Sequence, residues 1–140
     1  MSFPYRNTMK VRYSDTDPQG HMYFANYLVF ADEILGEFWG ELGMSFARLD
    51  KAPSLTFAVN TNIDFISECL ADDVLEVAAG FSRLGNTSAD TAFELTNLRT
   101  GEVAARGTFT HVFADKITRK STPIPAAFRA AIVARQPELA

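Results

Sequence analysis

The sequence predicts an α+β domain: an antiparallel sheet of about five strands around one long helix, in the order strand, helix, four strands, followed by a short C-terminal helix. Apolar residues recur at spacings of three and four from residue 27 to residue 42. Apolar and polar residues alternate over much of the remaining chain, and short turn signals separate the later alternating segments, which implies antiparallel neighbours. The length of 140 residues predicts a single domain spanning residues 1–140.

The first predicted element is a strand at residues 8–14, TMKVRYS. Met9, Val11 and Tyr13 alternate with polar residues, which is the pattern of a strand with one buried face. A turn-rich loop at residues 15–27, DTDPQGHMYFANY, follows this strand.

The long helix is predicted from residue 27 onward. One side carries Asn26, Glu33, Glu37 and Glu41. The other side is broadly apolar, so it needs a large surface to cover it, such as one face of a sheet. The apolar positions are Tyr27, Phe30, Ala31, Ile34, Leu35, Phe38, Trp39 and Leu42.

Four strands are predicted after the helix, at residues 56–67, 73–84, 87–98 and 102–114. Turn signals stand at residues 85–86 and 99–101. Residues 123–136, PIPAAFRAAIVARQ, predict a short helix that starts just after Pro125. In the first of the four strands, period two places one set of side chains on one face: Phe57, Val59, Thr61, Ile63 and Phe65.

Composition and charge exclude several classes of protein. Apolar residues make up 47% and charged residues 21%, as in soluble globular proteins. The net charge is −4 and no basic stripe is interleaved with aromatic residues, so no nucleic-acid partner is expected. The N-terminus lacks the apolar core of a signal peptide and no apolar run has membrane-spanning length, so we expect a cytoplasmic protein without a membrane partner.

Cysteine content and sheet coverage bear on metals and partners. The single cysteine, Cys69, excludes an internal disulfide and a multi-thiolate zinc site. One helix covers only one face of a sheet, so the other face and the edges remain exposed and a homo-oligomer is expected.

The loop at residues 15–27 admits a metal interpretation and a structural one. Its opening resembles a calcium loop, with acids at positions one and three and glycine at position six. Gln19 and Asn26 occupy positions five and twelve, however, so the bidentate glutamate is missing and no metal is expected. The structural interpretation is an ordinary turn before a helix, with Pro18 and Gly20 as turn residues.

The same loop also admits a catalytic interpretation. Asp17 would lie just before a long helix, whose first N–H groups lack internal partners and can hold a developing oxyanion. A carboxylate beside such donors can attack a carbonyl or deprotonate a water that attacks it. Met22, Tyr23 and Phe24 would form an apolar wall. The sequence has no G-x-S-x-G motif and no cysteine near the loop, so acyl hydrolysis here would depend on a carboxylate.

Residues 11–39, VRYSDTDPQGHMYFANYLVFADEILGEFW, resemble the signature of hotdog-fold acyl-CoA thioesterases of the 4-hydroxybenzoyl-CoA thioesterase class. In that signature a strand leads to D-x-D-x-x-G, an aromatic stretch, N-Y and the central helix. The resemblance implies a hotdog fold, hydrolysis of an acyl-CoA thioester to a carboxylic acid and free CoA, and no cofactor, since the CoA thioester is the substrate. The partners we expect are the acyl-CoA substrate and further copies of this chain, in a homodimer or homotetramer.

The resemblance assigns roles to residues of the loop. Asp17 matches the catalytic carboxylate, and the backbone N–H near Phe24 matches the group that polarises the thioester carbonyl. Tyr27 belongs to the N-Y pair beside the substrate pocket. His21 matches a position that is histidine in some members and apolar in others, so both a catalytic role and a positioning or packing role stay open.

Two further segments match more loosely. Residues 82–88, SRLGNTS, resemble the hairpin that borders the pantetheine channel, with Arg83 and Ser88 as substrate-binding residues. Residues 114–125, ADKITRKSTPIP, resemble the family's basic tail, in which Lys116, Arg119 and Lys120 would bind the CoA phosphates; a solvated basic tail is the alternative. Some relatives carry a basic cluster where Gly85, Asn86 and Thr87 stand here, so the choice of phosphate-binding groups stays open.

Two alternative functions and the role of His111 also stay open at this point. A hotdog protein that binds acyl-CoA or an acyl carrier without turnover is the first alternative. A hotdog dehydratase is weaker, because it places its acid and histidine on the central helix whereas His21 precedes it. His111, in the last strand, shares the parity of Phe109 and Phe113, so a packed histidine is predicted.

Overall fold

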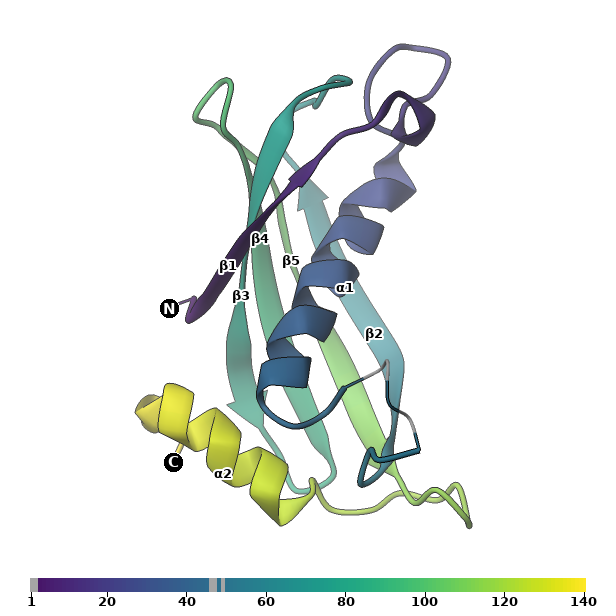
Figure 1. The fold of residues 1–140 in the computed structure, drawn as a ribbon, viewed down its shortest axis with the longest axis vertical. Helices are drawn as coiled ribbons and strands as arrows, with labels where there is room; N and C mark the ends of the chain where they lie inside the picture. The colour runs from purple at the N-terminus through teal and green to yellow at the C-terminus, as the bar shows by residue number, and fades with distance from the viewer. Residues whose placement is uncertain (1–2, 46–47, 49) are drawn as a thin grey trace.

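The computed structural model describes residues 3–45, 48 and 50–140. In this part of the chain, five antiparallel strands form one sheet in the order β1-β3-β4-β5-β2, and α1 crosses one of its faces (Figure 1). Short 3-10 turns stand at Tyr13–Asp15 and Pro137–Leu139. The strands and helices are β1 (Tyr5–Lys10), α1 (Phe24–Glu41), β2 (Leu55–Phe65), β3 (Val74–Leu84), β4 (Ser88–Asn97), β5 (Val103–Ala114) and α2 (Ala126–Arg135). The predicted α+β fold is confirmed.

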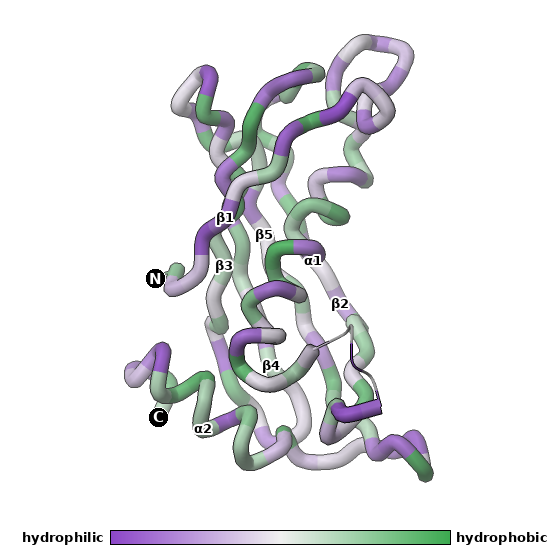
Figure 2. The backbone as a smooth tube through the Cα atoms, viewed as in Figure 1, coloured by the Kyte–Doolittle hydropathy of each residue, from purple (hydrophilic) through white to green (hydrophobic). Residues whose placement is uncertain are grey.

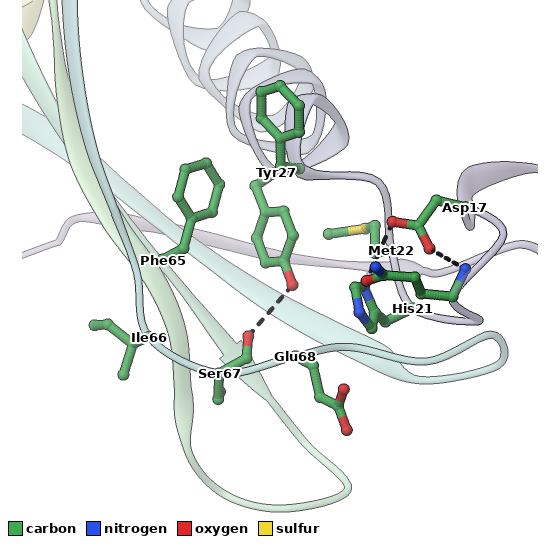
Figure 3. A pocket seen from close by; sticks show the side chains of 10 residues that line it. Asp17, His21, Met22, Tyr27, Phe65, Ile66, Ser67 and Glu68 are labelled. Atoms are coloured by element: carbon green, nitrogen blue, oxygen red, sulfur yellow. Dashed lines mark hydrogen bonds and ion pairs between the residues drawn. The ribbon is translucent and has the colours of Figure 1, made fainter.

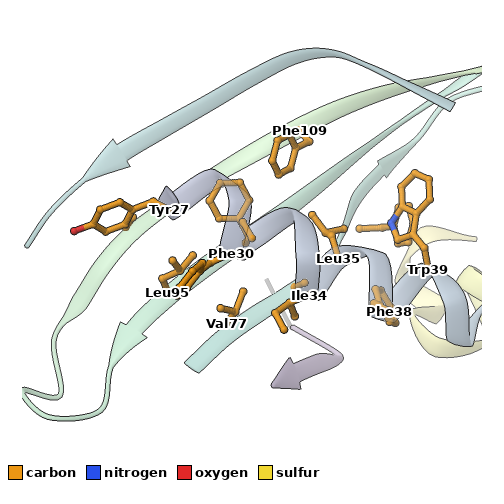
Figure 4. Close-up of a cluster of buried hydrophobic side chains, with 14 of the residues drawn as sticks. Tyr27, Phe30, Ile34, Leu35, Phe38, Trp39, Val77, Leu95 and Phe109 are labelled. Carbon is orange, nitrogen blue, oxygen red and sulfur yellow. The ribbon is translucent and has the colours of Figure 1, made fainter. Parts of the chain in front are cut away.

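The core lies between α1 and the inner face of the sheet (Figure 4). All eight predicted apolar positions of the helix are buried, which confirms the periodicity argument. Trp39 stacks on Phe113 of β5 with a ring centroid distance of 6.0 Å and on Phe81 of β3 at 5.6 Å. Hydrophobic and hydrophilic residues alternate along α1 (Figure 2), as expected for a helix with one face on a sheet.

The first strand differs from its prediction at both ends. β1 covers Tyr5–Lys10, and Tyr13 lies in a 3-10 turn with 87% of its surface exposed. The cause is local, because the Asp15 carboxylate accepts hydrogen bonds from the backbone N–H and the guanidinium of Arg12 and curls the chain out of the strand.

Strand β2 contains a bulge that sequence alternation does not reveal. Its register with β5 shifts between Ala58 and Asn60, so Val59 is the extra residue. Ala58 pairs with His111, whereas Thr61 pairs with Phe109. A bulge reverses the parity of the residues beyond it, so Phe57 does not share a face with Thr61, Ile63 and Phe65, and the single predicted face is wrong.

The position of β2 in the sheet also departs from the expected sequential meander. Strands β3, β4 and β5 are sequential neighbours, as the turn signals predict, but β2 pairs with β5 at one edge and β1 pairs with β3 at the other. This arrangement brings the end of β2 near the start of α1 and leaves the second side of β2 unpaired.

The C-terminal helix begins just after Pro125, as predicted. Beyond it, Gln136 is 1% exposed and its side chain bonds the backbone of Phe81 in β3: the amide oxygen accepts from the Phe81 N–H at 2.8 Å, and the amide nitrogen donates to the Phe81 oxygen at 2.9 Å. The register of β1 with β3 ends at Ala79, so Gln136 satisfies backbone groups that lie beyond the reach of β1. None of the helices in the described residues has the length and apolar character needed to cross a membrane.

A methyl group added at Gly107 is expected to lower stability by about 1 to 3 kcal/mol, because overpacking forces the surrounding backbone apart. A Cβ atom there would overlap the backbone oxygen of Asn62 and come within 2.7 Å of the Phe93 ring. Urea unfolding of Gly107→Ala measures the loss. Gly40→Ala in α1 is the matched control. Apart from the chain neighbours and the backbone of the helix itself, no atom lies within 4 Å of an added Cβ, so the substitution is expected to stabilise by about 0.5 to 1 kcal/mol. An equal loss of stability in both variants would contradict the packing argument.

Candidate active site

Asp17 begins a tight turn that leads from the first strand region into α1. The Gly20 N–H donates to the Asp17 backbone oxygen at 2.9 Å, and the Gln19 N–H donates to the Asp17 carboxylate at 2.9 Å. Gly20 has a φ of +87°, which glycine adopts without steric cost. The Asp17 N–H then bonds the His21 oxygen at 3.0 Å, closing a small hairpin. The turn interpretation of this loop is therefore correct, and it fixes where the Asp17 side chain points.

The two acids of the D-x-D motif have different environments. Asp15 is 5% exposed, and the Arg12 guanidinium beside it holds the pKa of its carboxyl below the usual range. Its backbone oxygen accepts from the Tyr23 N–H at 2.9 Å and from the Asn26 amide at 3.0 Å. Asp15 therefore ties the loop to the start of α1, while the Asp17 side chain keeps 22% of its surface accessible.

The first turn of α1 offers unused backbone donors. Helix α1 begins at Phe24, and no side chain caps its N-terminus. Within the described residues, the N–H groups of Phe24 and Ala25 donate to no acceptor, as is usual for the first turn of a helix. The helix dipole adds partial positive charge at this point, so an oxyanion would be stabilised there.

A cavity of about 440 Å³ lies between the 17–24 segment and the end of β2 (Figure 3). His21 Nδ1 lies 3.6 Å from an Asp17 carboxylate oxygen, close but longer than a hydrogen bond. The cavity thus combines a carboxylate, an imidazole and the start of a helix with apolar walls. Its lining residues are Asp17, Gln19, His21, Met22, Phe24, Tyr27, Phe65, Ile66, Ser67 and Glu68.

Aromatic rings form one wall of this cavity. The Phe65 ring meets Phe24 and Tyr27 edge to face, at centroid distances of 6.1 and 5.3 Å. The Tyr27 hydroxyl donates to the Ser67 backbone oxygen at 3.3 Å, and burial raises the pKa of Tyr27 above its ordinary value. Tyr27 therefore stays protonated near neutral pH and joins α1 to the segment after β2.

The segment after β2 is fixed in place by the buried carboxylate of Asp73, which pairs with the half-exposed Arg99. The Asp73 side chain is 5% exposed and accepts from Arg99 at 2.6 and 3.1 Å, from the Asn97 amide at 2.8 Å and from the Leu70 N–H at 2.8 Å. These contacts lower the pKa of Asp73 to about 2. The Cys69 backbone oxygen in turn accepts from the Met22 N–H at 2.7 Å, so the network holds both walls of the cavity together.

Four of the sequence-predicted site residues come together at the cavity: Asp17, His21, Phe24 and Tyr27. The opposite wall, Phe65 to Glu68, was not predicted. No local pattern marks it, since it reaches the cavity only because β2 pairs with β5 at the edge of the sheet.

Five other predicted substrate-binding residues do not line this cavity. Arg83 pairs with Asp90 at 2.8 Å and donates to Ser88 at 3.0 Å in the β3–β4 hairpin, and Lys116 donates to the backbone oxygens of Asp50 and Ala52. These segments lie at the opposite end of the sheet from the 15–23 loop (Figure 1). Arg119 and Lys120 belong to the same distant loop, where the Arg119 guanidinium stands 5.7 Å from the centre of the Phe57 ring.

Comparison with known proteins gives sequence relatives and structural neighbours that are named as CoA-thioester hydrolases or thioesterases. A 1,4-dihydroxy-2-naphthoyl-CoA hydrolase of Nostoc punctiforme is 29% identical over 126 residues, covering 89% of this chain and 82% of that protein. The crystal structure of a 1,4-dihydroxy-2-naphthoyl-CoA thioesterase from Synechocystis superposes with a TM-score of 0.83 at 22% identity, over 91% of this chain and 94% of the other.

A thioesterase from Thermus thermophilus, crystallised with coenzyme A and zinc, superposes with a TM-score of 0.85 at 24% identity, over 96% of both chains. These neighbours share the hotdog fold predicted from residues 11–39. The thioesterase-like superfamily matches residues 11–132, which is most of the chain. The protein therefore belongs to the thioesterase-like superfamily.

Proposed function

We propose that this protein, a thioester hydrolase by its family, cleaves an acyl-CoA thioester to a carboxylic acid and free CoA with Asp17 as the reacting carboxylate. The observation that carries the proposal is the cavity that Asp17 lines together with Phe24, the first residue of α1, whose N-terminus has no side-chain cap. The helix donors would hold the thioester oxygen as negative charge develops on it, and the carboxylate would act on the adjoining carbon.

Two chemical routes fit this arrangement. Asp17 can attack the carbonyl and form an acyl-enzyme anhydride, or it can deprotonate a water molecule that attacks instead. His21, 3.6 Å away, is placed to orient the carboxylate in either route. Prolonged turnover in ¹⁸O-labelled water distinguishes them, because only the anhydride route carries a water oxygen into the Asp17 side chain.

Release of free thiol from a panel of acyl-CoAs tests the proposal directly. Naphthoyl and other aryl thioesters belong in the panel because relatives of this chain are named for such a substrate. Hydrolysis that depends on Asp17 supports the proposal. Binding of acyl-CoA without thiol release would favour the alternative, a hotdog protein that binds acyl-CoA without turnover.

We further propose that two copies pair through the free side of β2. β2 has eleven residues with Asp64 as its one charged side chain, and Val59 and Phe65 are 57% and 49% exposed. The opposite edge strand, β1, has six residues and carries Arg6 and Lys10, and short charged edges resist pairing. Antiparallel pairing of β2 with its copy would close the sheet's one long unprotected edge.

This pairing would also bring distant basic residues to the cavity. An antiparallel β2 pair sets the Leu55 end of one copy against the Phe65 end of the other. Arg119 lies over Phe57, near the Leu55 end, so the second copy would present Arg119 and Lys120 beside the first copy's cavity. These two cations are therefore the proposed CoA phosphate ligands, and Lys116, which already bonds two backbone oxygens, is a support of that loop.

Lysine at position 59 is expected to weaken the dimer about tenfold or more, because residues near the two-fold axis meet their own copies and like charges repel across a strand pair. Sedimentation of Val59→Lys against the unmodified protein measures the shift. Val29→Lys is the matched control, since Val29 is 55% exposed on α1 and lies beside β1, away from β2. A stable monomer for the unmodified protein at micromolar concentration would refute the pairing.

A further inference from the structure

Asn26, in the first turn of α1, is a polar residue to which the proposed reaction assigns no part. The three glutamates of this helix are exposed, whereas Asn26 is partly buried. Its side-chain amide nitrogen donates to the backbone oxygen of Asp15 at 3.0 Å. Asparagine is a weak helix former, because its side chain competes for nearby backbone groups. Its place in the first turn of a long helix therefore calls for a reason.

The Asp15 oxygen belongs to a small hairpin, residues 15–23, that also carries the Asp17 carboxylate. The Tyr23 N–H donates to the same Asp15 oxygen at 2.9 Å, and the Asp17 N–H donates to the His21 oxygen at 3.0 Å. These hydrogen bonds hold the two sides of the hairpin together. A shift of the Asp15 backbone relative to α1 would therefore also shift the Asp17 carboxylate.

Asp15 is held from a second direction by Arg12. The Asp15 carboxylate accepts hydrogen bonds from the Arg12 backbone N–H at 2.9 Å and from the Arg12 guanidinium at 2.9 and 3.1 Å. The acceptor of the Asn26 hydrogen bond is therefore fixed on the side away from the helix. With the acceptor fixed, the Asn26 amide restricts where the first turn of α1 can lie relative to the hairpin.

The Asn26 hydrogen bond joins the two segments that the proposed reaction requires. The reacting carboxylate, Asp17, lies two residues beyond Asp15 in the hairpin. The proposed oxyanion donor, the Phe24 N–H, lies two residues before Asn26 in α1. The hairpin and the first turn of α1 line the same cavity (Figure 3). The Asp17 carboxylate accepts from the Gln19 N–H of its own turn, so its distance from the helix donors depends on how the hairpin is held.

Building on the proposed thioesterase function, we propose that Asn26 is a positioning residue: its hydrogen bond to the Asp15 oxygen keeps the Asp17 carboxylate in place relative to the N–H groups at the start of α1. Misplacement of a reacting group by about 1 Å can lower a rate about 10²-fold. The loss is expected in kcat, because the misplaced groups interact more strongly with the transition state than with bound substrate.

Two substitutions of Asn26 test the role. Asn26→Ala is expected to lower kcat for thiol release about 10- to 100-fold, with KM changed less than about twofold. Asn26→Asp keeps the shape of the side chain but replaces the donor with a carboxylate, so at neutral pH we expect at least the same loss. A protonated carboxyl can donate again, so the ratio of its kcat to that of the unmodified protein is expected to rise as the pH falls from about 7 to about 5. For Asn26→Ala this ratio is expected to stay constant.

Asn7→Ala is the matched control. The Asn7 amide also links β1 to α1, since it donates to the Glu37 carboxylate at 2.7 Å, but it lies away from the hairpin. Both alanine variants are expected to melt about 2 to 6 °C lower, the effect of one hydrogen bond, whereas kcat of Asn7→Ala is expected to stay within about twofold of the unmodified value. Equal kcat in Asn26→Ala and the unmodified protein overturns the positioning role and leaves the hydrolase intact. Equal losses of kcat in the two alanine variants also overturn it.

Hydrogen exchange separates this inference from the proposed function. If the unmodified protein releases thiol from no acyl-CoA, the proposed function fails, but the contact can still be tested without substrate. Faster amide exchange across residues 15–23 in Asn26→Ala than in Asn7→Ala supports the positioning role, because the hairpin would then open more often. Equal exchange in the two variants contradicts it.

Discussion

Asp17→Asn is expected to lower kcat for thioester hydrolysis by about 10² to 10⁴, the range for loss of a positioned acid or base. Asparagine keeps the size of the side chain and an oxygen that accepts the Gln19 N–H, so the turn is expected to persist. What disappears is the negative charge that attacks the carbonyl or takes a proton from water. Because this interaction acts in the transition state, kcat and kcat/KM are expected to fall together. Steady-state thiol release and a thermal melt of the same preparation measure both effects.

Glu68→Gln is the matched control for Asp17→Asn. Glu68 lines the same cavity as Asp17, so the substitution also removes one negative charge from that cavity. The Glu68 side chain lies on the segment after β2 rather than beside the start of α1, and we expect its loss to change kcat less than tenfold. Equal losses in the two variants would show that cavity charge, and not the Asp17 carboxylate itself, controls the rate.

Asp73→Ala is expected to lower the free energy of unfolding by about 1 to 3 kcal/mol, the cost of leaving buried donors without their acceptor. The substitution leaves the Asn97 amide and the Leu70 N–H without their acceptor. Asp50→Ala is the control, since Asp50 forms an exposed pair with Arg48, and such pairs contribute at most about 1 kcal/mol. Urea unfolding at neutral pH compares the variants. A loss below about 1 kcal/mol in Asp73→Ala would mean that the network does not hold the cavity walls.

The Asp73 contribution also depends on pH in a defined direction. Its pKa falls from 3.8 to about 2 on folding, so the folded state favours the charged form. The charged Asp73 carboxylate stabilises the folded state at pH values above the unfolded pKa. This contribution, roughly 2 kcal/mol, is lost as the pH falls from about 4 to about 2. The stability difference between the unmodified protein and Asp73→Ala is therefore expected to shrink across this interval. A difference that stays constant from about pH 6 to about pH 2 would contradict the assignment.

The parts of the fold that sequence patterns predicted are those governed by local physics. Helix α1 has its predicted buried face because a 3.6-residue period leaves one stripe for the sheet, and strands β3 to β5 follow from turn signals between alternating segments. Pro125 marks the start of α2 because its fixed φ suits the residue before a helix. Asp17 could be placed beside a helix start for the same local reason.

The parts that could not be predicted depend on contacts between distant segments. Nothing within residues 55–65 specifies β5 rather than β3 as the neighbouring strand, and one extra residue at Val59 reverses the faces of everything beyond it. The cavity wall from Phe65 to Glu68 depends on both the pairing of β2 with β5 and the bulge at Val59, so it could not be predicted. The end of β1 is a second feature that the sequence pattern does not predict. The hydrogen bonds from Arg12 to the Asp15 carboxylate end the strand before the alternating pattern ends.

The Gln136 side chain hydrogen bonds to both backbone groups of Phe81, and this limits where a strand of another molecule could add to the sheet. It occupies the place of an added strand on the β1 side of the sheet, where β1 itself is short and charged. A strand from another molecule therefore cannot pair with Phe81 on the β1 side of the sheet, whereas the outer side of β2 is unpaired. In the proposed pair, each copy's β2 would cover the free edge of the other's, so strand addition would stop at two molecules and would not continue into a fibril.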